Sequence, residues 1–454
     1  MRKLTVVAMA VLAVLAFAAS VFAVQAEIPA NTSAVVAKGK TQITLGGELA
    51  MRGRLFKNLD LEKSSSAGDD AFYQYQYILN LTAVTGKTKG VIELYSGNTG
   101  WVTWGSNSFQ KPANAGTKSA TEDTGMRFRQ LYLAFPVMGL NVSIGHQLGQ
   151  LGVASFVDFS KEGADMIHVS YPIDKKSSVA IGTIKVDENG DLGSSPSRDA
   201  DVYFGTADID LAGHMLGINI ATMSSSMASE AAYQVDGLWN WGVTLKGKLA
   251  SNLGYVFAGD IQSGKNKVSG GNTKYNGYHL RGVLNYQATS ALGLKLASIY
   301  YSGDKGNTTD KQEGFQTLLE DKNYATFIYG YLIRGVQGAT PIGNSALMGP
   351  STPVPAGTWF NVLGANYKFS KDLSAGLDFI WLRGTYKNIS AMSYNNSSKK
   401  IGWELDANIA YNLGDNLTYS VVAGMFDPGS AWARAANTDP KNAYAFEHKI
   451  TYKF

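Results

Sequence analysis

The last twelve residues of the chain, 443–454, alternate strictly between two kinds of side chain. Side chains of a β-strand point to opposite faces in turn, so this segment has one apolar, aromatic face and one charged face. Because the segment closes the sequence, nothing after it is expected to cover the apolar face. That face carries Tyr444, Phe446, His448, Ile450, Tyr452 and Phe454, and the other carries Ala445, Glu447, Lys449, Thr451 and Lys453.

A strand of about ten residues, apolar on one face and polar on the other, is the unit of a transmembrane β-barrel. The period is two residues rather than 3.6, which predicts strands and not helices. A soluble sandwich would need a second sheet over each apolar face, whereas a closed barrel in lipid leaves no sheet edge unpaired. The same alternation recurs at 41–57, 72–86, 231–249 and 400–413.

Connections between the expected strands alternate between short and long, as they do in outer-membrane barrels with periplasmic turns and extracellular loops. The alternation predicts an antiparallel barrel of about 18 strands, with 16 as the alternative because the strands at 90–95 and 179–186 are weak. Within the longest loop, 324–334 could form a strand or a hairpin arm. The short connections fall near 85–89, 136–140, 172–177, 212–214, 250–252, 288–291, 370–372 and 414–416, and the long ones near 58–71, 97–124, 150–164, 187–199, 223–229, 264–274, 303–357, 388–398 and 427–442.

The N-terminus predicts export. Arg2 and Lys3 precede an apolar run, and small residues follow it up to Ala26, which is typical of a secretory signal peptide rather than a transmembrane anchor. We therefore expect a signal peptide at 1–26, a periplasmic segment at 27–40 and a barrel at 41–454 in the bacterial outer membrane, in contact with lipid and lipopolysaccharide. The chain has no Cys, which excludes a disulfide framework and thiolate metal sites. Its net charge of +4 is too balanced to predict a nucleic-acid partner.

The segment 126–147, MRFRQLYLAFPVMGLNVSIGHQ, resembles the strand–turn–strand of general bacterial porins that leads into an inward-folded third loop. The signal peptide and the C-terminal strand resemble that family too, most closely the major porins of metal-reducing deltaproteobacteria. His146 departs from the motif, in which Arg is common at this position. The resemblance implies a water-filled channel for passive diffusion of small hydrophilic solutes and ions, without cofactor or enzyme activity. It also implies a homotrimer in which the second loop, 97–124, reaches over the neighbouring barrel.

By analogy with that family, the third loop at 150–164 forms the channel constriction and faces a basic wall. Opposed charges would set a transverse field and an ion preference at the narrowest point. The alternative is that these residues are ordinary solvated charges, and Arg127 and Arg129 share their parity with apolar Leu131 and Leu133. The predicted constriction residues are Asp158, Glu162 and Asp165 on the loop and Arg52, Arg54, Arg127, Arg129 and Arg281 on strands.

Three other functions fit parts of the pattern. A substrate-selective channel for oligosaccharides or anionic polymers would need a row of aromatic residues or an Arg-dominated lumen. A barrel enzyme would need a Ser/His pair with an orienting acid, and the five scattered His predict no metal site. A structural or adhesive protein would have its lumen plugged by the loop 303–357. The aromatic residues expected in loops could stack on a sugar, but packing within the loops or latching a neighbouring subunit is favoured. They are Trp101, Trp104, Phe156 and Phe159.

Overall fold

The computed structural model describes most of the predicted barrel and little before it. The predicted signal peptide, most of the segment 27–40 and most of the second loop lie outside the described residues. The described residues are 34–38, 40–61, 69–96, 101–104, 126–189, 198–225, 234–268, 271–304, 310–319, 326–330, 340–341, 357–386, 398–432 and 440–454.

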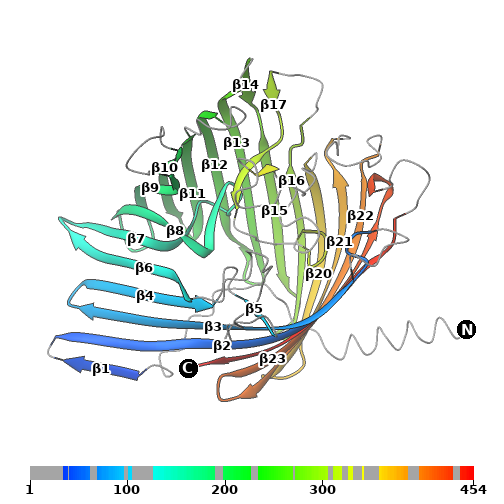
Figure 1. The fold of residues 1–454 in the computed structure, drawn as a ribbon, viewed down its shortest axis with the longest axis horizontal. Coiled ribbons are helices and arrows are strands. Elements are labelled where there is room, and N and C mark those ends of the chain that lie inside the picture. The colour runs from blue at the N-terminus through cyan, green and yellow to red at the C-terminus, as the bar shows by residue number, and fades with distance from the viewer. Residues whose placement is uncertain are drawn as a thin grey trace, which may run out of the picture.

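A closed antiparallel barrel of 18 strands forms the fold, which confirms the prediction from alternation (Figure 1). Each strand pairs with the next along the chain, including the two weak ones. The wall strands are β2 (Thr41–Lys57), β3 (Asp70–Thr85), β4 (Thr88–Ser96), β6 (Met126–Val137), β7 (Leu140–Gln150), β8 (Val157–Pro172), β9 (Ser178–Asn189), β10 (Arg198–Leu211), β11 (His214–Ser225), β12 (Gln234–Ala250), β13 (Leu253–Val268), β15 (Tyr278–Gln287), β16 (Leu292–Tyr301), β20 (Thr358–Lys368), β21 (Leu373–Gly384), β22 (Lys400–Gly414), β23 (Leu417–Pro428) and β24 (Ala443–Lys453).

Shorter elements accompany the wall. In the described part of the chain, no helix is long and apolar enough to cross a membrane. The predicted short connections all coincide with the tight turns between wall strands. The short elements are β1 (Ala34–Lys38), β5 (Val102–Thr103), β14 (Gly271–Tyr275), β17 (Lys311–Gln312), β18 (Gln316–Leu319), β19 (Thr340–Pro341) and the single helical turn η3 (Ser430–Trp432).

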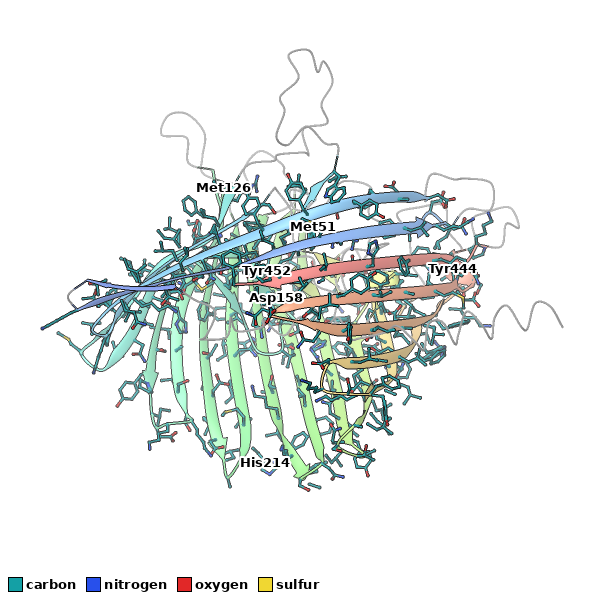
Figure 2. The ribbon with its side chains drawn as sticks, turned by 90° about the horizontal axis from the view of Figure 1, so that it is seen from below. Met51, Met126, Asp158, His214, Tyr444 and Tyr452 are labelled. Atoms are coloured by element: carbon teal, nitrogen blue, oxygen red, sulfur yellow. The ribbon has the colours of Figure 1, made fainter. Side chains whose placement is uncertain are left out.

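The two faces of the wall differ in exposure as the alternation predicted. Met51 on β2 and Leu363 on β20 are 50% and 62% exposed, whereas their neighbours Ala50 and Val362 are each 2% exposed. Figure 2 shows Met51, Tyr444 and Tyr452 among the side chains along the outside of the barrel. The apolar residues that a soluble protein would bury therefore form the outer surface, which suits hydrocarbon.

Aromatic side chains lie on this outer face near both ends of the strands. Trp239 and Trp241 stack at 5.7 Å between ring centroids towards the loop end of β12. Tyr452 and Phe454 stack at 6.0 Å at the turn end of β24. Amphipathic rings at two levels form the aromatic girdles of a membrane barrel.

The barrel closes between β2 and β24, from Glu48 opposite Lys453 to Lys57 opposite Tyr444. Beyond the end of β24, the amide of Gly47 donates a hydrogen bond to the Phe454 carbonyl over 2.8 Å. The small strand β1 then pairs with the remaining end of β2, with Ala34 opposite Leu45. Both terminal segments thus complete the wall on the same edge of β2.

Replacing Gly47 with Val should prevent this closure. A Cβ at Gly47 would lie 2.5 Å from the Ile78 carbonyl oxygen and 2.7 Å from the Phe454 ring, and the backbone oxygen cannot swing away. We expect loss of the folded band in cold detergent electrophoresis. Gly90→Val is the matched control, because a Cβ there meets only Leu133 Cδ2 at an ordinary 3.5 Å. Equal folding of the two variants would contradict this account.

The predicted third loop, 150–164, is mostly strand, which corrects the sequence interpretation. Only 151–156 separates β7 from β8, and Gln150 pairs with Asp158. The register then jumps from Gly149 opposite Phe159 to Gln147 opposite Ala164, so 160–163 bulges out of the ladder. Gly163 sits in this bulge with φ of +86°, a conformation that favours glycine. The bulge interrupts the alternation, which is why the segment resembled a loop in the sequence.

Candidate channel constriction

The tip of the β7–β8 hairpin enters the lumen and reaches β13 and β15, five and six strands further along the wall. The Ser155 hydroxyl donates a hydrogen bond to Asp260 Oδ2 on β13 over 2.7 Å. Arg281 on β15 donates a hydrogen bond from Nη1 to the Val153 carbonyl over 3.3 Å. Figure 1 shows β8 bending inward from the wall, consistent with these contacts. The third connection therefore enters the lumen, as the sequence predicted, although it is a short tip.

Asp260 is the acceptor that fixes this tip. Its Oδ2 also accepts a hydrogen bond from His279 Nδ1 over 2.8 Å, and its Oδ1 accepts from Asn240 Nδ2 over 3.0 Å. Asp260 is 4% exposed, and its donors Ser155, His279 and Asn240 are 3%, 0% and 0% exposed. Solvent therefore cannot replace the carboxylate as the acceptor for these donors. Ser155 and His279 both donate to Asp260 Oδ2, so in this arrangement the His does not act as the base of the Ser hydroxyl.

Part of the longest loop packs against the same tip. Leu318 on β18 lies opposite Val157 in a parallel pairing, and the Thr317 hydroxyl donates to the Ser155 carbonyl over 3.0 Å. Phe315 and Phe156 are 0% and 1% exposed. Two loops that are far apart in the sequence thus form one apolar contact inside the barrel.

A second piece of that loop, residues 326–330, docks on β22. The backbone amides of Ile328 and Tyr329 donate to the two carboxyl oxygens of Glu404 over 2.6 and 2.8 Å, and the amide of Phe327 donates to Asp406 over 2.9 Å. The Tyr329 ring packs against Phe426 at 5.7 Å between centroids. The described residues 326–330 form a tight turn and not a strand, because the acids bind three successive amides that a strand would orient alternately. The rest of 324–334, where the sequence allowed a strand or a hairpin arm, lies outside the described residues.

A basic group lies on the wall at β2. Arg52 is 7% exposed, and its Nε donates to Gln74 Oε1 over 2.8 Å. Its guanidinium lies 3.7 Å from the centroid of the Trp101 ring, a cation–π contact. Arg54 Nε contacts Glu447 Oε2 at 2.7 Å, and Arg52 Nη1 contacts the same oxygen at 3.4 Å. Trp101 thus packs within its own chain, whereas Trp104 stacks on Tyr73 of the outer face at 5.2 Å.

A β-bulge settles the orientation of the two arginines on β6. The register slips between Glu93 opposite Gln130 and Leu94 opposite Phe128, which leaves Arg129 as the extra residue. Arg127 then lies opposite buried Tyr95 on the lumen side, although Leu131 of the same parity is exposed outside. Arg129 forms an ion pair with Glu93 and also donates from Nε to the Lys161 carbonyl.

The acidic residues predicted for the constriction separate into three positions. Asp158 is 0% exposed beside the tip and accepts from the Ser160 hydroxyl over 2.6 Å. Glu162 lies on the bulge, 3.7 Å from Lys161 Nζ. Asp165 is on the outer face, where its Oδ1 lies 2.9 Å from His146 Nδ1, so its prediction as a lumen residue is wrong. The bulge at 160–163 shifts the parity and turns Asp165 outward.

Sequence reasoning missed several residues that the structure brings together. Glu404 and Asp406 lie within the alternating segment 400–413 but were not predicted as site residues, and neither were Asp260 and His279. Their strand parity placed them inside, but nothing in the sequence indicated which loop atoms they bind. Among the described residues, no group of three or more His, Asp and Glu is placed to hold a metal ion.

A closed barrel of this width, apolar outside and polar inside with loops folded into the lumen, has the architecture of a bacterial outer-membrane porin. OpdK, an outer membrane protein of Pseudomonas aeruginosa, matches with a TM-score of 0.57 and 11% identity over 90% of this chain and 98% of its own. OccK11 (OpdR) of the same organism matches with a TM-score of 0.56 and 12% identity over 91% and 96%. OccK2 (OpdF), solved in complex with glucuronate, matches with a TM-score of 0.55 and 11% identity over 90% and 98%.

At these identities the likeness shows the fold, and it supports the general resemblance to porins. The narrower resemblance to deltaproteobacterial porins gains no support from these Pseudomonas structures. No family model matches the sequence, and no curated protein matches it either.

Proposed function

We propose that the protein is an outer-membrane channel through which small hydrophilic solutes and ions diffuse passively. The observation that carries the proposal is the inner face of the closed wall, which presents Arg, Lys, Asp, Glu and Asn side chains while the outer face is apolar. Such a barrel encloses solvent rather than a dry core. OpdK, which has also been solved with vanillate, and OccK2, solved with glucuronate, support a path for small organic solutes.

The narrowest part lies where the β7–β8 tip and the 315–318 and 326–330 segments enter the barrel. The acidic side of this constriction includes Asp158 and Glu162, and the basic side includes Arg52, Arg54, Arg127, Arg129 and Arg281. Most of these arginines contact acids or carbonyls, so they hold the loops as well as set the local field. A plugged structural barrel is the competing reading, because the longest loop does enter the lumen.

Ohmic conductance steps from the purified protein in a planar bilayer test the proposal directly. A folded barrel that never conducts would reject it and favour a structural role. A substrate-selective channel is the second candidate, favoured by the dense hydrogen bonding of the inward segments. It predicts saturable transport of one solute class, whereas a general porin predicts flux that falls smoothly with solute size.

Reversing the charge of Arg127 should shift ion selectivity towards cations. Arg127 is exposed on the lumen side, so Arg127→Glu leaves the packed tip intact. A charge change near the path alters an ion's energy by about 0.5–1 kcal/mol after screening, a roughly two- to fivefold change in permeability ratio. The reversal potential in a KCl gradient measures it.

The matched control is Lys175→Glu in the exposed β8–β9 turn, which makes the same charge change outside the lumen. Equal shifts in the two variants, or none in either, would remove Arg127 from the ion path. Contact with lipopolysaccharide, the homotrimer and the deltaproteobacterial relation stay proposals. Chemical cross-linking in detergent tests the trimer.

A further inference from the structure

A cavity of about 540 Å³ lies near the turn ends of β12, β13, β15, β16, β20, β21 and β22, away from the constriction. Asn366 and Asn408 lie a few residues from the tight turns of their strands, which places the cavity at the periplasmic end of the lumen. Pockets of this size hold small organic ligands. The charged constriction residues are not among those that line it.

Two rows of inward residues form the floor of this cavity; glycines alternate with polar side chains in one, and a single glycine separates Lys295 from Asp378 in the other. One row reads Asn285, Lys295, Gly364 and Asp378 across four neighbouring strands. The other reads Gln287, Gly293, Asn366, Gly376 and Asn408.

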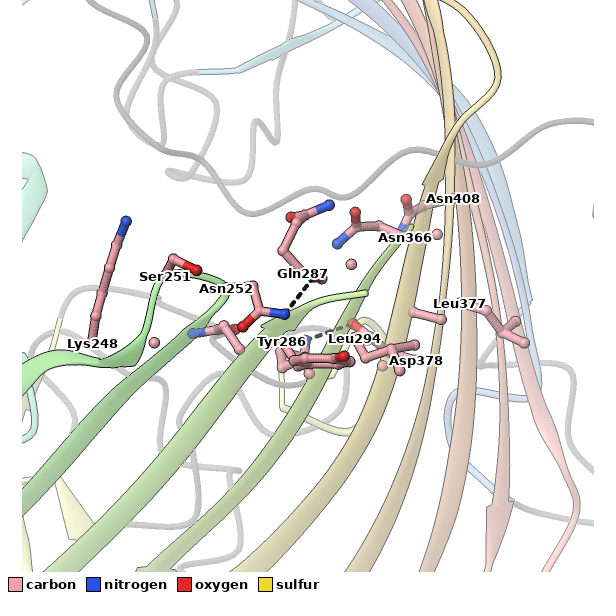
Figure 3. A pocket seen from close by; sticks show the side chains of 17 residues that line it. Lys248, Ser251, Asn252, Tyr286, Gln287, Leu294, Asn366, Leu377, Asp378 and Asn408 are labelled. Atoms are coloured by element: carbon pink, nitrogen blue, oxygen red, sulfur yellow. Dashed lines mark hydrogen bonds and ion pairs between the residues drawn. The ribbon is translucent and has the colours of Figure 1, made fainter. Parts of the chain in front are cut away.

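The glycines leave room for their neighbours to lie flat against the wall. A Cβ at Gly364 would come within 2.1 Å of Asp378 Oδ1. At Gly293 and Gly376 it would come within 2.9 Å of Asn366 Oδ1 and of Asn408 Oδ1, respectively. The result is a shallow shelf with backbone as its floor and amide groups around it. Figure 3 shows Gln287, Asn366 and Asn408 on the same side of the wall.

The shelf is rich in hydrogen-bonding groups, and the exposed Lys248 at its edge forms no ion pair with any described residue. Lys295 Nζ lies 2.9 Å from Asp378 Oδ2, so the ammonium and the carboxylate neutralise each other. The amides of Asn252, Asn285, Gln287, Asn366 and Asn408 each carry donors and an acceptor. Asn408 is 7% exposed, and its Oδ1 accepts no hydrogen bond from any described residue.

A buried acceptor without a donor is costly, and a ligand hydroxyl would satisfy it. Neighbouring hydroxyl groups that each donate and accept suit a row of amides, and the row from Gln287 to Asn408 itself carries no charge. We propose that this shelf is a low-affinity site for uncharged polyhydroxylated solutes of monosaccharide size. The inference rests on the proposed channel function and names a solute class for it.

Single-channel current noise with added glucose tests the inference, and glucuronate is the matched charged probe. We expect saturable, glucose-dependent noise with faster association from the periplasmic side. In Asn366→Ala/Asn408→Ala the binding constant should fall about tenfold, the loss expected from two neutral hydrogen bonds. KCl conductance should not change, since neither residue lies at the constriction. Asn366→Ala alone, which changes only an exposed side chain, repeats the test if the double variant folds poorly.

Asn361→Ala is the control, because Asn361 lies on the same strand but faces outward and pairs with Ser298. Normal KCl conductance without glucose-dependent noise would reject the proposed solute site but would leave the proposed channel function intact. Saturable current noise with glucuronate but not with glucose would overturn the assignment to uncharged solutes. A protein that conducts nothing would instead reject the channel itself, so the two failures are distinguishable.

Discussion

Glu404→Gln should widen the channel by releasing the 326–330 turn from β22. The Gln side chain has one acceptor oxygen where Glu404 has two, so its amino group would face the amide of either Ile328 or Tyr329, donor against donor. Hydrogen bonds to carboxylates contribute about 1.5–3 kcal/mol each, and about 1.4 kcal/mol shifts an equilibrium tenfold. We therefore expect the docked population of the 326–330 turn to fall at least about tenfold and single-channel conductance to rise.

Asp406→Asn is the matched control for this variant. Asp406 accepts the Phe327 amide through Oδ2 and shares a side-chain hydrogen bond with Glu404. An Asn can turn its oxygen to the Phe327 amide and its amino group to Glu404. Its conductance should stay close to that of the unmodified channel. Folded state is checked by cold detergent electrophoresis, because a misfolded barrel would also change conductance. If a folded Glu404→Gln protein conducts like the parent, the docked turn does not narrow the path.

Asp260→Ala should loosen the other inward element, the β7–β8 tip. The change leaves the donors of Ser155, His279 and Asn240 without their acceptor in a site that is almost fully buried. A buried donor without a partner costs about 1–3 kcal/mol. We expect a lower midpoint of urea unfolding in detergent and frequent brief closures in single-channel records, because the tip is no longer fixed to β13.

Asp260→Asn should reduce both defects, the lowered unfolding midpoint and the brief closures, since Asn keeps the shape of the side chain and one acceptor oxygen. Asp208→Ala on β10 is the control, because it removes an exposed carboxylate from the lumen wall without disturbing the buried group. Steady currents and an unchanged unfolding midpoint in Asp260→Ala would show that the tip is held by packing alone.

The strands of this protein follow from its sequence because lipid and lumen impose opposite chemistry on alternate residues. The bounds expected for 41–57 are those of β2, and the end of the chain forms β24 as expected. Alternation fails to predict side-chain orientation beyond a β-bulge, since one extra residue makes every later side chain point to the opposite face. The bulge at Arg129 turned Arg127 inward, and the one before Ala164 turned Asp165 outward.

The interior of the lumen could not be predicted in the same way. Its key contacts join residues that are far apart in the chain, such as Ser155 with Asp260 and Tyr329 with Glu404. Each depends on where a loop tip comes to rest, which no local period encodes. The resemblance to porins supplied the inward third connection but not its acceptor. The sequence therefore identified the lumen charges without indicating which of them hold the loops.

The seam on β2 makes this barrel nearly a continuous ring of polypeptide. Phe454 pairs with Gly47 and Ala34 lies opposite Leu45, so a single position separates the two strands that run in the same direction along β2. A circularly permuted protein, with Phe454 joined to Ala34 by a very short linker and new ends opened in an extracellular loop, would keep every pairing of the wall. The chain ends can therefore be moved from this seam to a loop without changing which strands are neighbours in the wall.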